Sequence, residues 1–256
     1  SSSSSPEIAS GIVLNDDLKF LQNSSGTLTV SGVIENGTSD SIVKAGTGRL
    51  VLSGANTYSG TTTVSAGTLE LGQDERLNDI SDVDVANSAT FNIAGFTETI
   101  DQLDGSMSAS VDLTGANTGG QLTAKGGTFE GDITGDTASR LIMNATSNTL
   151  DLTGGDNSSF SGKMTVSAGT LQGDTDALTT GISNSGSVVF DQDGSESNGG
   201  LYDSVISDTG DVTKTGTGNL LIDKAQTYTG PTSIQNGTLK LKTGADLSNL
   251  TDVDVA

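Results

Sequence analysis

The sequence feature that most constrains the fold is a Gly/Thr-rich stretch that occurs twice. Residues 46–69 read GTGRLVLSGANTYSGTTTVSAGTL, and residues 216–239 read GTGNLLIDKAQTYTGPTSIQNGTL. At a constant offset of 170 the two copies align without a gap over residues 44–86 and 214–256, and both close on DVDVA. A third, partial copy at residues 150–172 contains FSGKMTVSAGTL, at an offset of 102 from the first. Repetition with variable spacers is typical of solenoids.

Short runs of alternating apolar and polar residues predict the strands of this fold. Examples are Thr27–Val30, Thr62–Val64 and Leu220–Ile222, and Gly-containing turns separate such runs. No window has a convincing helical period, and the nearest candidate is short, around Asp74–Ile80. An antiparallel sandwich or barrel would fit the strands but would not require the repeat. A parallel β-helix would require such a repeat, because its turns stack and equivalent positions in successive turns form ladders.

The spacing of the copies predicts the size of one turn. The offset of 170 divides into eight turns of about 21 residues, and the offset of 102 into five turns of about 20. We therefore predict an all-β parallel β-helix, or β-solenoid, of about 12 rungs, with Val, Leu and Ile inside and Thr, Ser, Asn and Asp outside.

The organisation of the chain follows from the same repeat. We expect residues 1–10 to form a flexible leader and residues 11–256 to form a single β-helix segment. The chain stops at DVDVA, where the first copy runs on into NSATFNIAGFTETIDQL. We therefore expect the segment to be cut within a repeat at its C-terminus.

Composition excludes several functional classes. The chain has 256 residues, with 11 Lys and Arg against 32 Asp and Glu, and it has no Cys and no His. It can therefore form no disulfide, no zinc site of Cys and His ligands, no Cys nucleophile and no Ser-His-Asp triad. The net charge of −21, with scattered basic residues, argues against binding to nucleic acid or to an anionic membrane surface. We expect no cofactor.

The repeated stretch resembles the passenger-associated transport repeat of bacterial autotransporters, the type V secreted surface proteins, and in particular their AIDA-like adhesin group. The likeness rests on K-x-G-T-G, the following L-x-L, the A-N-T-Y-S-G box and the closing A-G-T-L, whose order Lys214–Leu239 keeps. The resemblance implies a right-handed parallel β-helix at the cell surface of a Gram-negative bacterium. It also implies a partner, the protein's own C-terminal membrane β-barrel, which is not in this chain.

The stretch FDQDGSESNGGLYD at residues 190–203, here called the acidic loop, is the first candidate site. Its candidate ligand-binding residues are Asp191, Asp193, Glu196 and Asp203, and carboxylate oxygens are the ligands that Ca²⁺ prefers. The EF-hand pattern fails, because Glu196 stands where Gly is needed and no glutamate ends the loop. We therefore expect a solvated loop that interrupts the rungs, and we assign no metal site.

Aromatic residues recur at one place in the repeat. Tyr58, Phe160 and Tyr228 occupy equivalent positions in the three copies. They would form either a platform for sugar rings or a packing position at the corner of a rung. We favour packing, because recurrent aromatic residues usually dominate the core.

The closing DVDVA is the last candidate. Alternation places Asp82 and Asp84, and likewise Asp252 and Asp254, on one face of a strand, with the valines on the other. We expect an exposed acidic face, and the alternative is a recognition surface for a basic partner.

These observations favour an adhesin over an enzyme. Enzymes with this fold need paired carboxylates, and here no His is available as a base and no G-D-S-G box is present. We assign no catalytic residue and expect no enzymatic activity. We expect attachment to a host extracellular-matrix protein, or to another copy of the chain in aggregation and biofilm formation, and the net charge favours the first. The main alternative is a stalk that supports export and presents a distal domain, and an enzyme or toxin passenger ranks below it.

Overall fold

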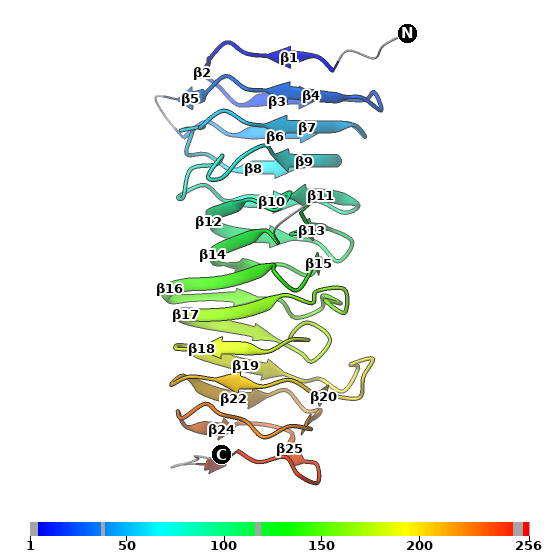
Figure 1. Ribbon diagram of the computed structural model, residues 1–256, viewed down its shortest axis with the longest axis vertical. Helices are drawn as coiled ribbons and strands as arrows, with labels where there is room; N and C mark the ends of the chain where they lie inside the picture. Colours follow the sequence, from blue (N-terminus) through cyan, green and yellow to red (C-terminus); the bar gives the residue numbers. More distant parts are fainter. Residues whose placement is uncertain (1–4, 37–38, 116–118, 248–252, 256) are drawn as a thin grey trace.

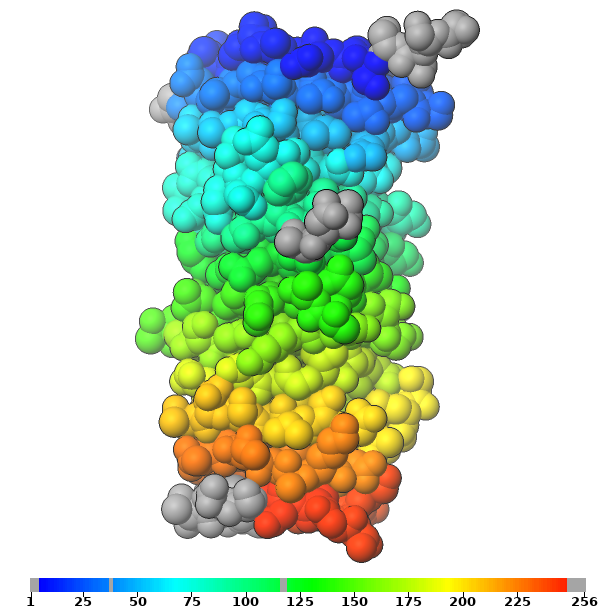
Figure 2. All heavy atoms as spheres, viewed as in Figure 1, coloured from blue at the N-terminus to red at the C-terminus, as the bar shows by residue number. Residues whose placement is uncertain are grey.

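The computed structural model describes residues 5–36, 39–115, 119–247 and 253–255. Within these ranges the chain forms strands, turns and bends, and it contains no helix of the length and hydropathy that crossing a membrane requires. All strand pairings among them are parallel. Figure 1 shows a stack of coils with the two termini at opposite ends, and in Figure 2 the coils form one continuous column. The predicted parallel β-helix is confirmed.

Each full coil contributes to three faces of the rod, numbered here in chain order. The first face consists of β1 (Glu7–Ile8), β4 (Thr27–Val30), β7 (Arg49–Leu52), β9 (Gly67–Leu71), β11 (Ala89–Asn92), β13 (Ser110–Asp112), β15 (Asp132–Thr134), β20 (Leu201–Tyr202), β23 (Asn219–Ile222) and β25 (Thr238–Leu241). The second face consists of β2 (Ile12–Leu14), β5 (Ile34–Asn36), the first halves of β12 (Thr97–Gly105), β14 (Gln121–Thr128), β16 (Arg140–Asp151) and β17 (Lys163–Gly173), and then β18 (Ile182–Asn184) and β21 (Ile206–Ser207). The third face consists of β3 (Leu18–Leu21), β6 (Ile42–Ala45), β8 (Thr62–Val64), β10 (Val83–Val85), the second halves of β12, β14, β16 and β17, and then β19 (Ser187–Asp191), β22 (Asp211–Thr215), β24 (Thr232–Ile234) and β26 (Val253–Val255).

Four long strands turn the corner between the second and third faces. β12, β14, β16 and β17 have 9, 8, 12 and 11 residues, so each contributes to both faces. The register shifts where they bend, for example between Ala124 and Gly127. As a result the strands of the two faces form one 14-stranded sheet, except for β2 and β5, which pair with each other separately.

Inward ladders of apolar side chains fill the rod, as predicted. Along the first face, Leu50, Leu69, Phe91, Val111 and Ile133 lie on consecutive coils, and all five side chains are fully buried. Each buried ladder contributes about 1.5–3 kcal/mol per side chain, because apolar surface leaves water. The residues between them in each strand face outward.

The rod has about 11 turns, where about 12 were predicted. Along the third face the chain returns from Leu18 at one end to Val253 at the other in steps of about 21 residues, the predicted turn size. The count is lower because the residues before Leu18 do not complete a further turn on this face. The right-handed sense stays an expectation, in line with the preference of parallel crossovers.

The two full copies lie eight turns apart, as the offset of 170 predicts. The third face runs from β6, which contains Lys44, through β8, β10, β12, β14, β16, β17 and β19 to β22, which contains Lys214. Both copies therefore occupy the same faces, with their closing T-L on the first face in β9 and β25.

The third copy does not occupy the same faces, so the prediction of five whole turns for the offset of 102 is wrong. Five steps from β8 lead to the second half of β17, which contains Leu171. The residues that match β8 in sequence, Met164–Val166, lie instead in the first half of β17, on the second face. The third copy therefore begins one face earlier in the coil than the two full copies. This is possible because the motif specifies only the local path of the chain, and strands pair in the same parallel way on all three faces.

Two other expectations about local structure are corrected or resolved. Glu7 and Ile8 pair with Thr29 and Val30, so the rod begins before residue 11, and the leader expected over residues 1–10 is too long. The residues around Asp74–Ile80, the nearest helical candidate, form turns and bends.

A buried lysine lies inside the rod in each full copy of the repeat. Lys44 is fully buried, and its Nζ donates to the carbonyl oxygens of Gly46 at 2.7 Å and Ala66 at 2.8 Å. Lys214 repeats this arrangement with the carbonyl oxygens of Thr215, Gly216 and Asn236. Burial lowers the pKa of both ammonium groups. We call each arrangement a lysine cage.

The cage connects two successive coils. Gly46 follows β6 directly, whereas Ala66 lies one coil further along. One ammonium group thus satisfies carbonyl oxygens at the corner of both coils, where the ladder leaves acceptors unpaired.

Lys44→Met is expected to lower the free energy of unfolding by about 2–4 kcal/mol, because it leaves buried carbonyl oxygens without a donor. Lys19→Met is the matched control, since Lys19 is exposed on the same face, and it should change stability by less than about 0.5 kcal/mol. Urea unfolding followed by circular dichroism measures both. Equal effects of the two substitutions would show that the cage contributes no stability.

Candidate functional site

The acidic loop begins in the last two residues of β19, and it includes β20 at its other end. Its side chains bind mainly the loop itself and the preceding coil. Asp193 Oδ1 accepts from Ser195 N at 2.7 Å, and Glu196, which is 9% exposed, accepts from Gly194 N at 3.2 Å. Ser197 N and Oγ donate to Asp176 of the preceding coil. These contacts hold the loop on the preceding coil.

The four predicted ligand-binding residues are not gathered at one point. Burial lowers the pKa of Lys214 and the charge of Asp191 raises it in part, which places Asp191 near the lysine cage. Asp203 instead lines a shallow open groove of about 250 Å³, together with Thr175, Asn198 and Tyr202. In the part of the chain that the structure describes, no group of three or more acidic side chains is placed to hold a metal ion. A ligand-binding role for the acidic loop stays a prediction.

The recurrent aromatic residues are core residues. Tyr58, Phe160 and Tyr228 are 0%, 2% and 3% exposed. The hydroxyl groups of Tyr58 and Tyr228 hydrogen-bond Thr62 Oγ1 at 2.6 Å and Thr232 Oγ1 at 2.5 Å. A platform for sugar rings needs exposed ring faces, so the packing prediction is confirmed.

Buried amide side chains near these aromatic residues were not predicted. Asn56 Oδ1 accepts from Ile34 N at 2.9 Å in the preceding coil, and Asn56 Nδ2 donates to Arg76 O at 2.8 Å in the following coil. Asn157 repeats both bonds, since its Oδ1 accepts from Ile133 N and its Nδ2 donates to Ala177 O. Gln226 repeats only the first, since its Oε1 accepts from Ile206 N, whereas its Nε2 donates to Ser204 O of the preceding coil and to Lys224 O. The signal for two of them was the amide residue two positions before Tyr58 and Tyr228.

An acidic patch occurs where DVDVA was expected to present one. Val83 and Val85 are fully buried, and Asp84 is exposed on the outer side of β10. Asp84 pairs in register with Asp104 of β12, and Asp82 Oδ1 accepts from Gln102 N at 3.3 Å. Burial raises the pKa of Asp82, and the charges of Asp101 and Asp104 raise it further. We call Asp82, Asp84, Asp101 and Asp104 the aspartate patch.

The second DVDVA is not available for comparison. Asp252 lies outside the described residues, and the side chain of Asp254 does as well. The prediction of an exposed acidic face is therefore confirmed for the first copy alone.

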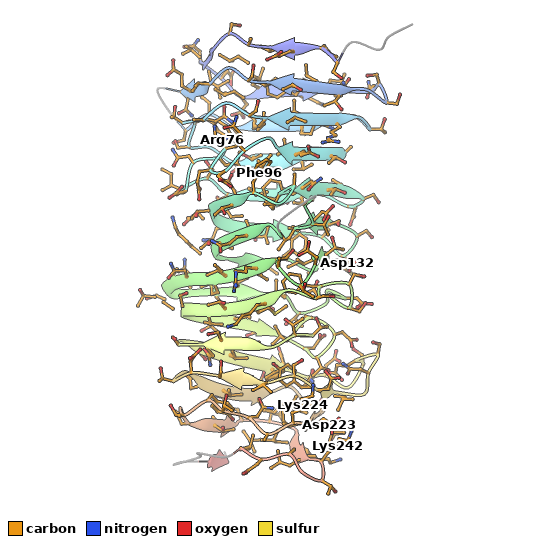
Figure 3. All side chains as sticks on the ribbon, viewed as in Figure 1. Arg76, Phe96, Asp132, Asp223, Lys224 and Lys242 are labelled. Atoms are coloured by element: carbon orange, nitrogen blue, oxygen red, sulfur yellow. The ribbon has the colours of Figure 1, made fainter. Side chains whose placement is uncertain are left out.

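Few positive charges oppose the aspartate patch. Lys125 Nζ lies 3.9 Å from Asp101 Oδ1 and also donates to the carbonyl oxygen of Asp79. Arg76, in the turn before β10, donates its Nε to Asp74 O and its Nη1 to Ser53 O. Figure 3 shows Lys224 and Lys242 near the C-terminal end, where Lys242 pairs with Asp223 at 2.9 Å. The patch therefore keeps most of its negative field.

A buried carboxyl group lies in the same strand as part of this patch. Glu98 of β12 is fully buried and accepts from Arg76 N at 2.7 Å and Leu77 N at 3.1 Å, which holds the 73–80 turn against the rod. Burial raises the pKa of Glu98 to about 8, the charges of Glu75 and Asp79 raise it, and the two backbone bonds lower it. Alternation with the outward Thr97 and Thr99 is the sequence signal that places Glu98 inside.

The stability of the rod should fall as pH rises from about 5 to 8. An unfolded Glu loses its proton near pH 4.5, whereas folded Glu98 keeps it to about 8, so the folded state binds the extra proton in this window. The stabilisation is fully present below pH 4.5 and is lost towards pH 8, by at most about 5 kcal/mol. Urea titrations at several pH values measure this slope.

Glu98→Gln should flatten this slope, because glutamine does not titrate. The single side-chain oxygen of glutamine can accept only one of the two backbone hydrogen bonds well, so stability should also be lower at every pH. Glu130→Gln, on the exposed surface, is the control and should leave the slope unchanged. The same slope in Glu98→Gln and in the unaltered chain would contradict the assignment.

Comparison with known proteins agrees with the repeat and the fold. The family model described as passenger-associated transport repeat matches residues 42–71, 147–172 and 212–241, which overlap the three copies. The chain is also similar to the adhesin BmaC autotransporter of Brucella suis biovar 1 (strain 1330), with 33% identity over 175 residues. The similar region covers 63% of this chain and 5% of that relative.

The location of the segment follows from these findings. A passenger with these repeats is exposed at the surface of the Gram-negative outer membrane. The parallel β-helix, the three transport repeats and the sequence shared with a named autotransporter adhesin together support the assignment of this chain as a segment of an autotransporter passenger domain.

Proposed function

We propose that this segment is part of a surface adhesin and that it attaches to a basic region of a host extracellular-matrix protein. The observation that carries the proposal is the aspartate patch, where Asp84 and Asp104 stack in register on the outside of the rod. Similarity to a protein named as an adhesin supports the general class. The net charge of −21 supports a partner of opposite charge.

The shape of the rod supports a binding mode with many weak contacts. Ladders of outward side chains repeat at the spacing of parallel strands, as where Thr63, Asp84 and Asp104 follow one another on the third face. Each exposed ion pair contributes about 0.2–1 kcal/mol. A crowded cell surface with many rods would add such contacts by multivalency.

A second candidate is a stalk that supports export through the protein's own C-terminal β-barrel and presents a distal domain. Polar side chains that bond one another along the rod favour it, since they need no external partner. Arg49 pairs with Glu70, which accepts from Asn92 Nδ2 at 3.1 Å, and Asp151 accepts from Gln172 Nε2 at 3.1 Å. The transport repeats also favour this role.

The proposal predicts that Asp84→Asn together with Asp104→Asn weakens binding to immobilised matrix protein about tenfold at low salt, because two charge contacts are lost. The matched control is Asp16→Asn with Asp17→Asn, which removes the same charge near the N-terminal end of the rod. Raised salt should reduce the difference between the two variants. The segment would be displayed on a non-adherent bacterium and bound cells would be counted.

A settling assay separates the alternatives. Displaying cells of one colour are mixed with non-displaying cells of another. Clumps of displaying cells alone would establish self-association in place of matrix binding. Matrix binding that falls equally in both variants would show that total charge matters and the patch does not. Neither clumping nor matrix binding would leave the stalk as the function.

A further inference from the structure

We propose that Asn236 is a site of spontaneous deamidation, and that the reaction loosens the C-terminal coils by disturbing the cage of Lys214. Asn followed by Gly is the sequence in which the next backbone nitrogen is least shielded, because Gly has no side chain. The chain contains three such pairs, Asn36–Gly37, Asn198–Gly199 and Asn236–Gly237. Gly37 lies outside the described residues, so the geometry of the other two pairs is compared.

The turn at Asn236 holds the reacting groups together. Asn236 and Gly237 are exposed between β24 and β25, and Gly237 N donates to Asn236 Oδ1 at 2.8 Å. This bond places Cγ, the carbon that carries Oδ1, next to the nitrogen that must attack it. Such proximity accelerates reactions within one molecule.

The reaction needs only solvent water. Gly237 N, after losing its proton to solvent, bonds to Asn236 Cγ, and the side-chain nitrogen leaves as ammonia. The product is a five-membered succinimide. Water then opens either C–N bond of that ring and gives aspartate or isoaspartate. No oxidant, reductant or cofactor takes part.

Asn198 provides an internal comparison, because its side chain is held in another position. Asn198 Oδ1 accepts from Gly200 N at 2.9 Å, Leu201 N at 3.1 Å and Thr175 Oγ1 at 2.8 Å. Its Nδ2 donates to the carbonyl oxygens of Thr175 and Leu201, both at 3.1 Å. Attack by Gly199 N requires several of these bonds to break, so Asn198 should react slowly.

Deamidation at Asn236 alters a packed turn. The carbonyl oxygen of Asn236 accepts from Lys214 Nζ at 3.4 Å. Gly237 has φ +74°, and a Cβ there would lie 2.4 Å from Gly218 O. Isoaspartate at position 236 adds one atom to the backbone directly before this close approach of Gly237 to Gly218. The equivalent positions in the other copies hold Ala66 and Ala168, which have no amide to lose.

The test is peptide mapping by mass spectrometry of the folded chain kept at 37 °C and pH 8, with isoaspartate measured by enzymatic methylation. Asn236 should deamidate about tenfold or more faster than Asn198, because the latter must first break its hydrogen bonds. In urea, where both side chains are free, the two rates should become similar. Equal rates in the folded chain, faster loss at Asn198, or no loss at Asn236 would overturn the proposal.

Two substitutions separate the reaction from its structural effect. Asn236→Ala takes the residue of the other copies and should keep the C-terminal coils resistant to protease during ageing. Asn236→Asp carries the new charge with a normal backbone and should stay more resistant than the aged chain rich in isoaspartate. If ageing leaves the protease resistance of the unaltered chain unchanged, the proposed loosening is wrong.

Discussion

The structure depends on the backbone hydrogen bonds that each coil makes with the coils before and after it. These bonds form only where the chain returns to the same face, yet the length of one return varies from 17 residues between Thr170 and Ser187 to 25 between Gly135 and Phe160. The corners absorb this variation. There, the lysine cages and the buried amides of Asn56, Asn157 and Gln226 satisfy backbone groups that the ladder leaves unpaired.

Much of this fold can be predicted from the sequence, because the period of the repeat and the alternation within strands are both local signals. Thr27–Val30 and Thr62–Val64 are strands with the predicted bounds. The burial of the ionisable side chains of Lys44 and Glu98 was missed, since such residues are rarely buried and alternation alone had to place them inside. The shift of the third copy by one face was missed because a motif specifies one coil and carries no information about which face that coil occupies.

The acidic loop and the aspartate patch differ in whether backbone N–H groups nearby can bind their carboxylates. Carboxylates in loops bind nearby backbone N–H groups, as Asp193 and Glu196 do, and this was not visible from composition. Carboxylates on strands cannot do so within their own strand, so Asp84 points outward and its charge is available to a partner. The alternation in DVDVA therefore predicted Asp82 and Asp84 of the aspartate patch, whereas the roles of the acidic loop depend on the preceding coil. The patch is the feature on which an adhesive role depends.

The most direct test of this account is the removal of one coil. Gln121 pairs with Arg140, so deleting residues 121–139 removes a whole return and lets β16 pair with β12. We predict that the shortened chain stays folded, unfolds cooperatively, and is shorter by about 5 Å in small-angle X-ray scattering. Deleting residues 121–130 removes half a coil and should abolish folding of the neighbouring turns, because the chain can no longer reach the next face in register. Equal loss of structure in both deletions would contradict a rod built from independent coils.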